Sequence, residues 1–164
     1  MTTAIAPSDE YLTFKIGAEE YGIDILLAQE IRSYEPPTHI MNAPAFLKGV
    51  VHLRGVIVPI IDLRLKLGYA SAEYNHFTVM IVLNLGNRVV GAVVDSVSDV
   101  LMFTSDTISP APSTNTRIDS SCVIGIGSVD GRTVTLLDAV NLLAGDYEAF
   151  HPAMSWPTTS KGFS

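Results

Sequence analysis

Four histidines are the first candidates for chemistry in this sequence, because imidazole is the commonest metal ligand and general base in proteins. No two of them stand two or four residues apart, and no cysteine lies near one, whereas metal sites usually show such spacing. His52 alternates with apolar neighbours, which indicates a half-exposed strand residue. We therefore expect no metal site. The four are His39, His52, His76 and His151.

The single cysteine and one glycine-rich segment do not match catalytic or cofactor-binding motifs either. Cys122 precedes an apolar run, so we interpret it as a small buried hydrophobe and not as a nucleophile. Residues 125–131 resemble a dinucleotide-binding loop, but the third glycine comes one position late, and a strand-like run follows where a helix N-terminus is needed. Asp130-Gly131 is better explained as a hairpin turn. The sequence predicts no cofactor.

Charged residues within apolar runs are the remaining polar feature, and they are Glu30, Arg32, Arg54 and Arg64. A buried arginine without a partner is costly, and Glu30 is the candidate partner of Arg54. Two interpretations stay open, namely a Glu30–Arg54 ion pair or two independently solvated side chains. Such a pair would hold a binding surface in shape rather than take part in catalysis.

The composition limits the class of protein that positions these residues. Of 164 residues, 48% are hydrophobic and 16% charged, which excludes an intrinsically disordered chain. The net charge of -7 argues against binding to nucleic acid or to an anionic membrane. The first ten residues do not resemble a signal peptide, and the most apolar window, residues 50–61, is too short to cross a bilayer. We expect a protein of the reducing cytosol, which suits its single cysteine.

Short strands dominate the expected structure. Residues 26–32 fit either a short helix or the continuation of a bent strand. Asp62 is expected to cap a short helix over residues 63–67, which Gly68 ends. From Gly145 onward the sequence loses its periodicity, and we expect that tail to fray. The expected strands are 11–16, 21–25, 49–53 and 56–61.

The second half of the chain repeats the plan of the first, at shifts of 69 and then 76 residues. We infer an internal duplication with repeats of about 11–68 and 77–145. Strands this short close best as small antiparallel barrels, and two barrels of about 65 residues need to share apolar surface to be stable. The matched pairs include Gly22 with Gly91, Glu30 with Asp99, Ile31 with Val100, and Asp62 with Asp138.

An ordered series of motifs over residues 10 to 145 resembles the CheW family of bacterial chemotaxis coupling proteins. The motifs fall in order with compatible spacing, which makes the resemblance specific. They include Tyr21-Gly-Ile-Asp-Ile25, Gln29-Glu-Ile-Arg32, Asn42-Ala-Pro-Ala-Phe46, Leu53-Arg-Gly-Val-Ile-Val-Pro59, Ile61-Asp-Leu-Arg64, Val97-Ser-Asp-Val100 and Ile108-Ser-Pro110.

The resemblance implies a mainly β fold, with two five-stranded SH3-like barrels packed around a shared hydrophobic core. It implies one CheW-like domain over residues 10–145, with tails at 1–9 and 146–164. Members of the family are non-catalytic adaptors that join the histidine kinase CheA, through its regulatory domain, to the cytoplasmic tips of methyl-accepting chemoreceptors. The chain is then expected in the cytoplasm, recruited to membrane-associated receptor arrays without inserting into the membrane.

Carried over by motif, the resemblance also implies two functional surfaces. A groove for the receptor hairpin would use Ile25, Ala28, Glu30, Val79, Val97 and Val100. Gly49, Arg54 and Gly55 would either couple to the kinase or organise the joint surface of the two partners. The chain departs from the family pattern at two positions. Ala28 stands where a larger branched residue is common, and His52 stands where asparagine is common.

Three alternatives remain at this point. The same fold occurs in receiver-bearing scaffolds and in the kinase itself, but the chain ends soon after the second repeat, which favours a stand-alone adaptor. A CheW-like scaffold could instead serve a different sensory kinase pathway, such as motility or surface sensing. An enzyme with a cleft between two barrels would need convergent titratable residues in that cleft.

Overall fold

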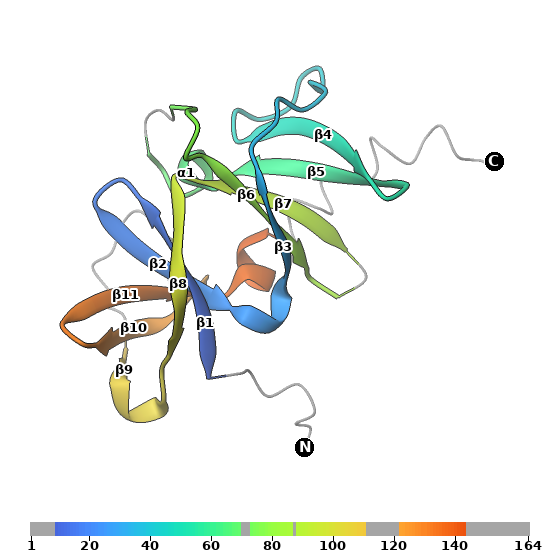
Figure 1. The fold of residues 1–164 in the computed structure, drawn as a ribbon. Helices are drawn as coiled ribbons and strands as arrows, with labels where there is room; N and C mark the ends of the chain where they lie inside the picture. Colours follow the sequence, from blue (N-terminus) through green and yellow to red (C-terminus); the bar gives the residue numbers. More distant parts are fainter. Residues whose placement is uncertain (1–8, 70–72, 87, 111–121, 144–164) are drawn as a thin grey trace.

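The computed structural model describes residues 9–69, 73–86, 88–110 and 122–143, which form two β-sheets (Figure 1). One sheet consists of β1 (Glu10–Ile16), β2 (Glu19–Asp24), β8 (Ser96–Met102), β9 (Ile108–Ser109), β10 (Val123–Val129) and β11 (Arg132–Leu137), in the order β8-β1-β2-β11-β10-β9. The other consists of β3 (Ala28–Ser33), β4 (Leu47–Leu53), β5 (Val56–Asp62), β6 (Val79–Asn84) and β7 (Val89–Val94), in the order β3-β6-β7-β5-β4. Short helices are η2 (Ile25–Leu27), α1 (Leu63–Lys66) and η3 (Ser105–Thr107), and residues 139–143 after β11 are also helical.

Each sheet is curled because one segment of the chain contributes to both of its edges. β8 is an edge strand, and after η3 the same segment returns as β9, which pairs with β10 at the opposite edge. In the five-stranded sheet, β3 is an edge strand, and Thr38 farther along the chain bridges Val50 of β4, which is the other edge. This arrangement fits the two small barrels expected from the sequence, and the mainly β fold class is confirmed.

The two sheets do not coincide with the two repeats. The β1–β2 hairpin lies in the sheet that also holds β8 to β11, and the β6–β7 hairpin lies with β3 to β5 (Figure 1). A shift of 69 residues carries β1, β2 and β3 onto β6, β7 and β8, and a shift of 76 carries β4 and β5 onto β10 and β11. Applied to the order β3-β6-β7-β5-β4, this mapping gives β8-β1-β2-β11-β10, which is the order in the other sheet. The first hairpin of each repeat therefore lies in the sheet that the remaining strands of the other repeat form, so the two hairpins are exchanged.

Two glycines allow the exchanged hairpins to approach the strands that receive them. Gly91 of β7 lies opposite Ile60 in the parallel β5–β7 pair, and a Cβ atom there would come within 2.7 Å of the Ile60 Cδ1 atom. Gly22 of β2 occupies the equivalent place opposite Leu136, where a Cβ atom would lie 3.1 Å from the Leu136 Cδ2 atom. A side chain at either position would therefore force the neighbouring side chains of the receiving strand to shift.

Three apolar clusters form the core. The largest draws on both sheets and includes Phe14 and Ile81, each fully buried, so the two sheets share one hydrophobic core as the sequence predicted. A second cluster, around Ile60, belongs to the five-stranded sheet. A third, around Phe103 and Leu136, belongs to the six-stranded sheet.

Most of the expected elements are present, and the segment 26–32 takes the second of its two expected forms. That segment is the η2 turn followed by strand β3, and not a helix, because β3 gains backbone pairing with β6. The short helix after Asp62 is confirmed as α1, and the Asp62 carboxylate accepts a hydrogen bond from the Arg64 backbone N–H at 3.0 Å. The tail from Gly145 lies outside the described residues.

Candidate functional site

The six residues expected to bind a receptor lie on or beside two edge strands. Ala28 and Glu30 belong to β3, Ile25 to the η2 turn before it, and Val97 and Val100 to β8. Val79 begins β6 and pairs with Ser33 at the far end of β3. We call these six residues the β3/β8 surface. In Figure 1, β3 and β8 both run along the side of the molecule that faces the viewer.

The two strands of this surface are built alike because the repeats are alike. The β3–β6 pairing shifts register between Ala28 and Glu30, and the β1–β8 pairing shifts at the equivalent place, beside Val97. A bulge of this kind re-aims side chains on an edge strand. Ala28 and Val97 therefore occupy matching positions, and both pack against the shared core.

Four members of the β3/β8 surface are partly buried, and one is largely exposed. Ile25, Ala28, Val79 and Val97 are partly buried against the shared core. Val100 is 46% exposed, and its repeat equivalent Ile31 is 47% exposed. The sequence analysis left Ile31 out of the site, although the 69-residue shift already matched it with Val100. Each edge strand thus presents an exposed branched side chain, Val100 within the β3/β8 surface and Ile31 next to it.

Glu30 is the charged member of this surface, and it binds two arginines. Its carboxylate accepts a hydrogen bond from Arg32 Nη1 at 3.0 Å and lies 2.5 Å from Arg54 Nη2. The ion pair with Arg54 predicted from the sequence is therefore present. Hydrogen bonds from Arg32 and then Arg54 lower the pKa of Glu30 from its ordinary value. Arg54 remains 72% exposed, so the pair lies at the surface, where it orients side chains more than it stabilises the fold.

The three residues expected to couple to the kinase do not form one surface. Arg54 and Gly55 form the β4–β5 turn, with φ angles of 52° and 80°, and are exposed. Gly49 is buried within β4, and a Cβ atom there would overlap the backbone oxygen of Thr38. A substitution at Gly49 would therefore act through the closure of the five-stranded sheet. Val56 and Ile57 follow the turn with 50% and 41% of their surface exposed, and sequence reasoning did not single them out.

A second charged cluster stands at the equivalent place in the other sheet. Arg132 of β11 forms an ion pair with Glu20 of β2, and its Nη1 and Nη2 atoms donate to Asp99 of β8 at 3.1 and 3.0 Å. Thr13, fully buried, donates to Asp99 Oδ1 at 2.9 Å. Burial is the largest single influence on the pKa of Glu20 and raises it, but the hydrogen bond and charge of Arg132, together with hydrogen bonds from Thr13 and Ser98, leave the pKa lowered. Asp99 matches Glu30 in the repeat, so each edge strand carries one paired carboxylate.

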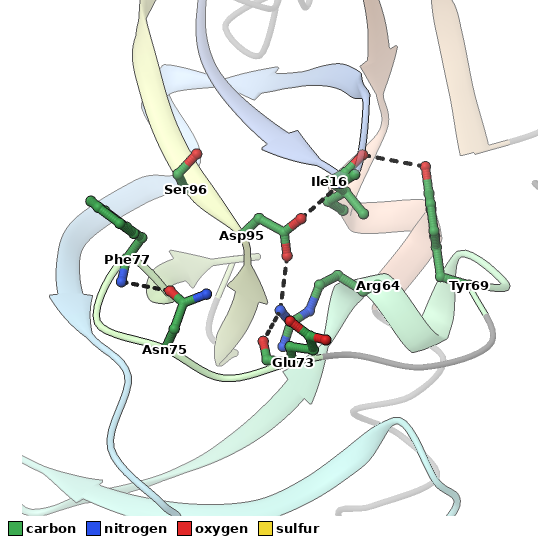
Figure 2. A pocket seen from close by; sticks show the side chains of 9 residues that line it. Ile16, Arg64, Tyr69, Glu73, Asn75, Phe77, Asp95 and Ser96 are labelled. Atoms are coloured by element: carbon green, nitrogen blue, oxygen red, sulfur yellow. Dashed lines mark hydrogen bonds and ion pairs between the residues drawn. The ribbon is translucent and has the colours of Figure 1, made fainter.

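An open pocket of about 560 Å³ lies between the two sheets, next to the start of β8. Its walls include Ile16 at the end of β1, Gly17 in the β1–β2 turn and Arg64 of α1 (Figure 2). Asp95, directly before β8, and Phe77, two residues before β6, also line it. Arg64 is buried and donates to Asp62, to Asp95 and to the Glu73 backbone oxygen. Arg64 and Asp95 of the pocket bind each other, which suits a structural link between the sheets.

Most of the residues first considered for chemistry are described by the structure, whereas His151 lies outside the described residues. Cys122 is a buried free cysteine, as expected, and His52 is exposed on β4. Asp130 and Gly131 form the β10–β11 turn, as predicted. In the described ranges, no group of three or more His, Cys, Asp or Glu side chains could hold a metal ion. No helix among the described residues is both long and apolar enough to cross a membrane.

Comparison with known proteins identifies a family. The model of the CheW-like domain matches residues 10–146. A chemotaxis protein CheW of Klebsiella aerogenes is 51% identical over 137 residues, covering 84% of this chain and 82% of the relative. A probable chemotaxis protein CheW of Rhizobium etli is 36% identical over 129 residues, covering 79% of this chain and 83% of that protein. The crystal structure of the scaffolding protein TtCheW from Thermoanaerobacter tengcongensis aligns with a TM-score of 0.76 and 28% identity, over 83% of this chain and 92% of that one.

Proposed function

This chain belongs to the CheW-like domain family of non-catalytic chemotaxis scaffolds, and from that premise we propose that it joins the regulatory domain of the kinase CheA to the tips of chemoreceptors. The chemotaxis role is common to the relatives named above, and nothing in them favours a different sensory pathway. The proposal concerns the two partners, the residues that contact them, and a cytoplasmic protein recruited to receptor arrays.

The matched edge strands β3 and β8 are the single observation that carries the receptor part of the proposal. Each presents an exposed branched apolar side chain, Ile31 or Val100, beside partly buried neighbours that rest on the shared core. A helix that docks on a protein needs such apolar anchors with a polar rim. Glu30, held by Arg32 and Arg54, supplies the rim on the β3 side. The two-helix tip of a receptor is an occupant with matching geometry.

The exposed end of the β4–β5 hairpin supports the kinase part of the proposal. Arg54 and Gly55 form its turn, and Val56 and Ile57 add apolar surface directly after it. A regulatory domain built from similar barrels could bury these side chains in a barrel-to-barrel contact. Since Glu30 binds Arg54, the receptor and kinase surfaces meet at this ion pair. One rigid body would then hold both partners.

A calorimetric titration with the regulatory domain of CheA from the same organism tests the kinase contact. We expect saturable one-to-one binding with a dissociation constant of about 10 micromolar or tighter. A second titration uses a soluble fragment of the receptor tip. Val100→Glu, which places a charge on the apolar surface, should weaken the receptor contact and leave the kinase contact intact. Absence of kinase binding, both alone and with receptor fragment present, would refute the proposed role.

A further inference from the structure

We infer that Arg64 and Asp95 are positioning residues that fix the orientation of β8 against the five-stranded sheet, and thereby the shape of the β3/β8 surface. The inference rests on the proposed receptor function, which it deepens. It concerns the point where the chain leaves one sheet and enters the other. β7 ends at Val94 in the five-stranded sheet, and β8 begins at Ser96 in the six-stranded sheet, so Asp95 is the crossing residue.

One carboxylate joins the two sheets at this crossing (Figure 2). Asp95 Oδ1 accepts a hydrogen bond from Arg64 Nη1 at 2.8 Å, and Arg64 lies on α1, directly after β5. Asp95 Oδ2 accepts from the Gly17 backbone N–H at 2.7 Å, in the turn between β1 and β2. The Asp95 backbone N–H also donates to the Lys15 carbonyl oxygen at 3.1 Å. The position of β8 is therefore tied to both sheets within two residues of Val97.

Arg64 is itself held in place by several hydrogen bonds besides the one to Asp95. Its Nε and Nη2 atoms donate to the two oxygens of Asp62 at 2.9 and 2.8 Å, and Nη1 also donates to the Glu73 carbonyl oxygen at 2.7 Å. Asp62 is fully buried and accepts a further hydrogen bond from the Tyr74 hydroxyl at 2.5 Å. Burial alone would lower the pKa of Arg64, but its hydrogen bonds to Asp62 and Asp95 outweigh burial and raise it, so the link stays charged.

The equivalent crossing in the other repeat has no such link. The 69-residue shift places Leu26 at the position of Asp95, and the 76-residue shift places Val140 at that of Arg64. Neither side chain can form an ion pair, and Leu26 is 71% exposed. That crossing is the η2 turn, which carries Ile25 and leads into Ala28. One strand of the β3/β8 surface is thus tied by an Arg64–Asp95 ion pair, whereas the other follows a turn in which the two matching positions are apolar and Asp24 caps η2.

Orientation, more than stability, is what this link adds. The Asp95 side chain is 40% exposed, and an ion pair with one solvated partner contributes little net stability. It restricts geometry, since a bidentate guanidinium accepts few arrangements of its partners. The open pocket of about 560 Å³ lies beside Arg64 and Asp95, so side chains do not fill the space between the sheets there. On this side, the polar link takes the place of a packed core.

The test compares Asp95→Asn with Asp106→Asn in the full chain, because both remove one negative charge and Asp106 lies in η3, away from the crossing. Spin labels on Gln29→Cys and Met102→Cys, both exposed, in a Cys122→Ala background report the distance between β3 and β8. We expect a broadened distance distribution for Asp95→Asn only. Affinity for the receptor-tip fragment should fall about fivefold or more, a usual size for coupling between sites, with kinase affinity unchanged.

The outcomes separate this inference from the proposed function. An unchanged distance distribution in Asp95→Asn, or an equal change in Asp106→Asn, overturns the inference. A broadened distribution with unchanged receptor affinity establishes the link between the sheets and refutes the β3/β8 surface as the receptor site. If Asp95→Asn folds poorly, Arg64→Lys serves instead, because lysine keeps the charge but cannot bridge Asp62 and Asp95 with a planar fork.

Discussion

Glu30 on β3 and Arg54 in the β4–β5 turn form an ion pair at 2.5 Å that joins strands from the two ends of the five-stranded sheet. In the sheet order, β3 and β4 are the outermost strands, so the pair can form only because the sheet curls. Its two residues also belong to the two surfaces proposed for receptor and kinase. The ion pair is therefore placed to hold those surfaces in a fixed relation.

Breaking this ion pair should weaken assembly more than folding. We expect Glu30→Lys and Arg54→His to reduce formation of the complex with receptor fragment and kinase, measured by analytical ultracentrifugation. The midpoint of thermal unfolding should change little, because exposed ion pairs contribute little stability. Equal, large losses of thermal stability and of assembly in both variants would show that the pair has a folding role instead.

A large side chain at the start of β3 should separate the two partners. Ala28 is partly buried and adjoins Ile25 on the β3/β8 surface. We expect Ala28→Trp to block binding of the receptor-tip fragment and to spare the kinase regulatory domain, as measured by calorimetry. Gln29→Trp, on the exposed neighbouring position, is the matched control. Loss of both partners in Ala28→Trp would contradict the division into two surfaces.

Gly91 should be less tolerant of a methyl group than its repeat equivalent. A Cβ atom at Gly91 would lie 2.7 Å from Ile60 Cδ1 and 2.9 Å from Met80 Sδ, whereas the nearest atom at Gly22 is 3.1 Å away. We expect Gly91→Ala to cost about 1–3 kcal/mol of unfolding free energy, as overpacked cores do. Gly22→Ala should cost less. Urea denaturation of both variants checks the order, which a larger loss in Gly22→Ala would reverse.

The loss of coupling expected from substitutions at Gly49 should follow from misfolding. Gly49 has φ 145° and no room for a Cβ atom beside the Thr38 backbone oxygen. Gly55 has φ 80° but nothing within 4 Å of its Cβ position, which makes it the matched control. We expect Gly49→Ala to lower the thermal midpoint far more than Gly55→Ala. Normal stability of Gly49→Ala together with lost kinase binding would instead assign Gly49 a contact role.

Acid should weaken the six-stranded sheet through Glu20. Its pKa in the folded protein is lowered, chiefly by Arg132 acting against burial, so the stabilisation is complete above the pKa of free glutamate, about 4.3. It is lost as the pH falls through the lowered folded value. Glu20→Gln should therefore be less stable than the parent chain at pH 7, with the difference shrinking below about pH 4. Denaturation at several pH values measures this, and a difference independent of pH would contradict it.

Local sequence features predicted much of the fold. Alternation defined the strands, Asp62 defined the start of α1, and the glycines at matched positions defined the repeat. The exchange of hairpins could not be predicted in this way, because the partner of a strand is decided by contacts distant in sequence. The same limit applies to the segment 26–32, where pairing with β6 selects the strand over a helix.

Some residues of the candidate site could likewise be predicted from the sequence, and others could not. The need of a charged side chain for a partner predicted the Glu30–Arg54 pair. The same reasoning identified Arg64 as a side chain that needs a partner. It could not identify Asp95 as that partner, because Asp95 is 31 residues away in the sequence. Ile31 was missed although its match with Val100 was visible in the sequence, because a resemblance to a family selects residues one at a time. The symmetry of the repeat is a second source of site residues.

The exchange of hairpins also has a consequence for each repeat on its own. Neither repeat holds all the strands of one sheet, so a single repeat made alone would leave the place of its hairpin empty and its hairpin without a sheet. Two separate copies could satisfy both needs by trading hairpins reciprocally. In the present chain both needs are met within one molecule, and the crossing at Asp95 is where the exchanged hairpin β6–β7 ends and the chain enters the other sheet.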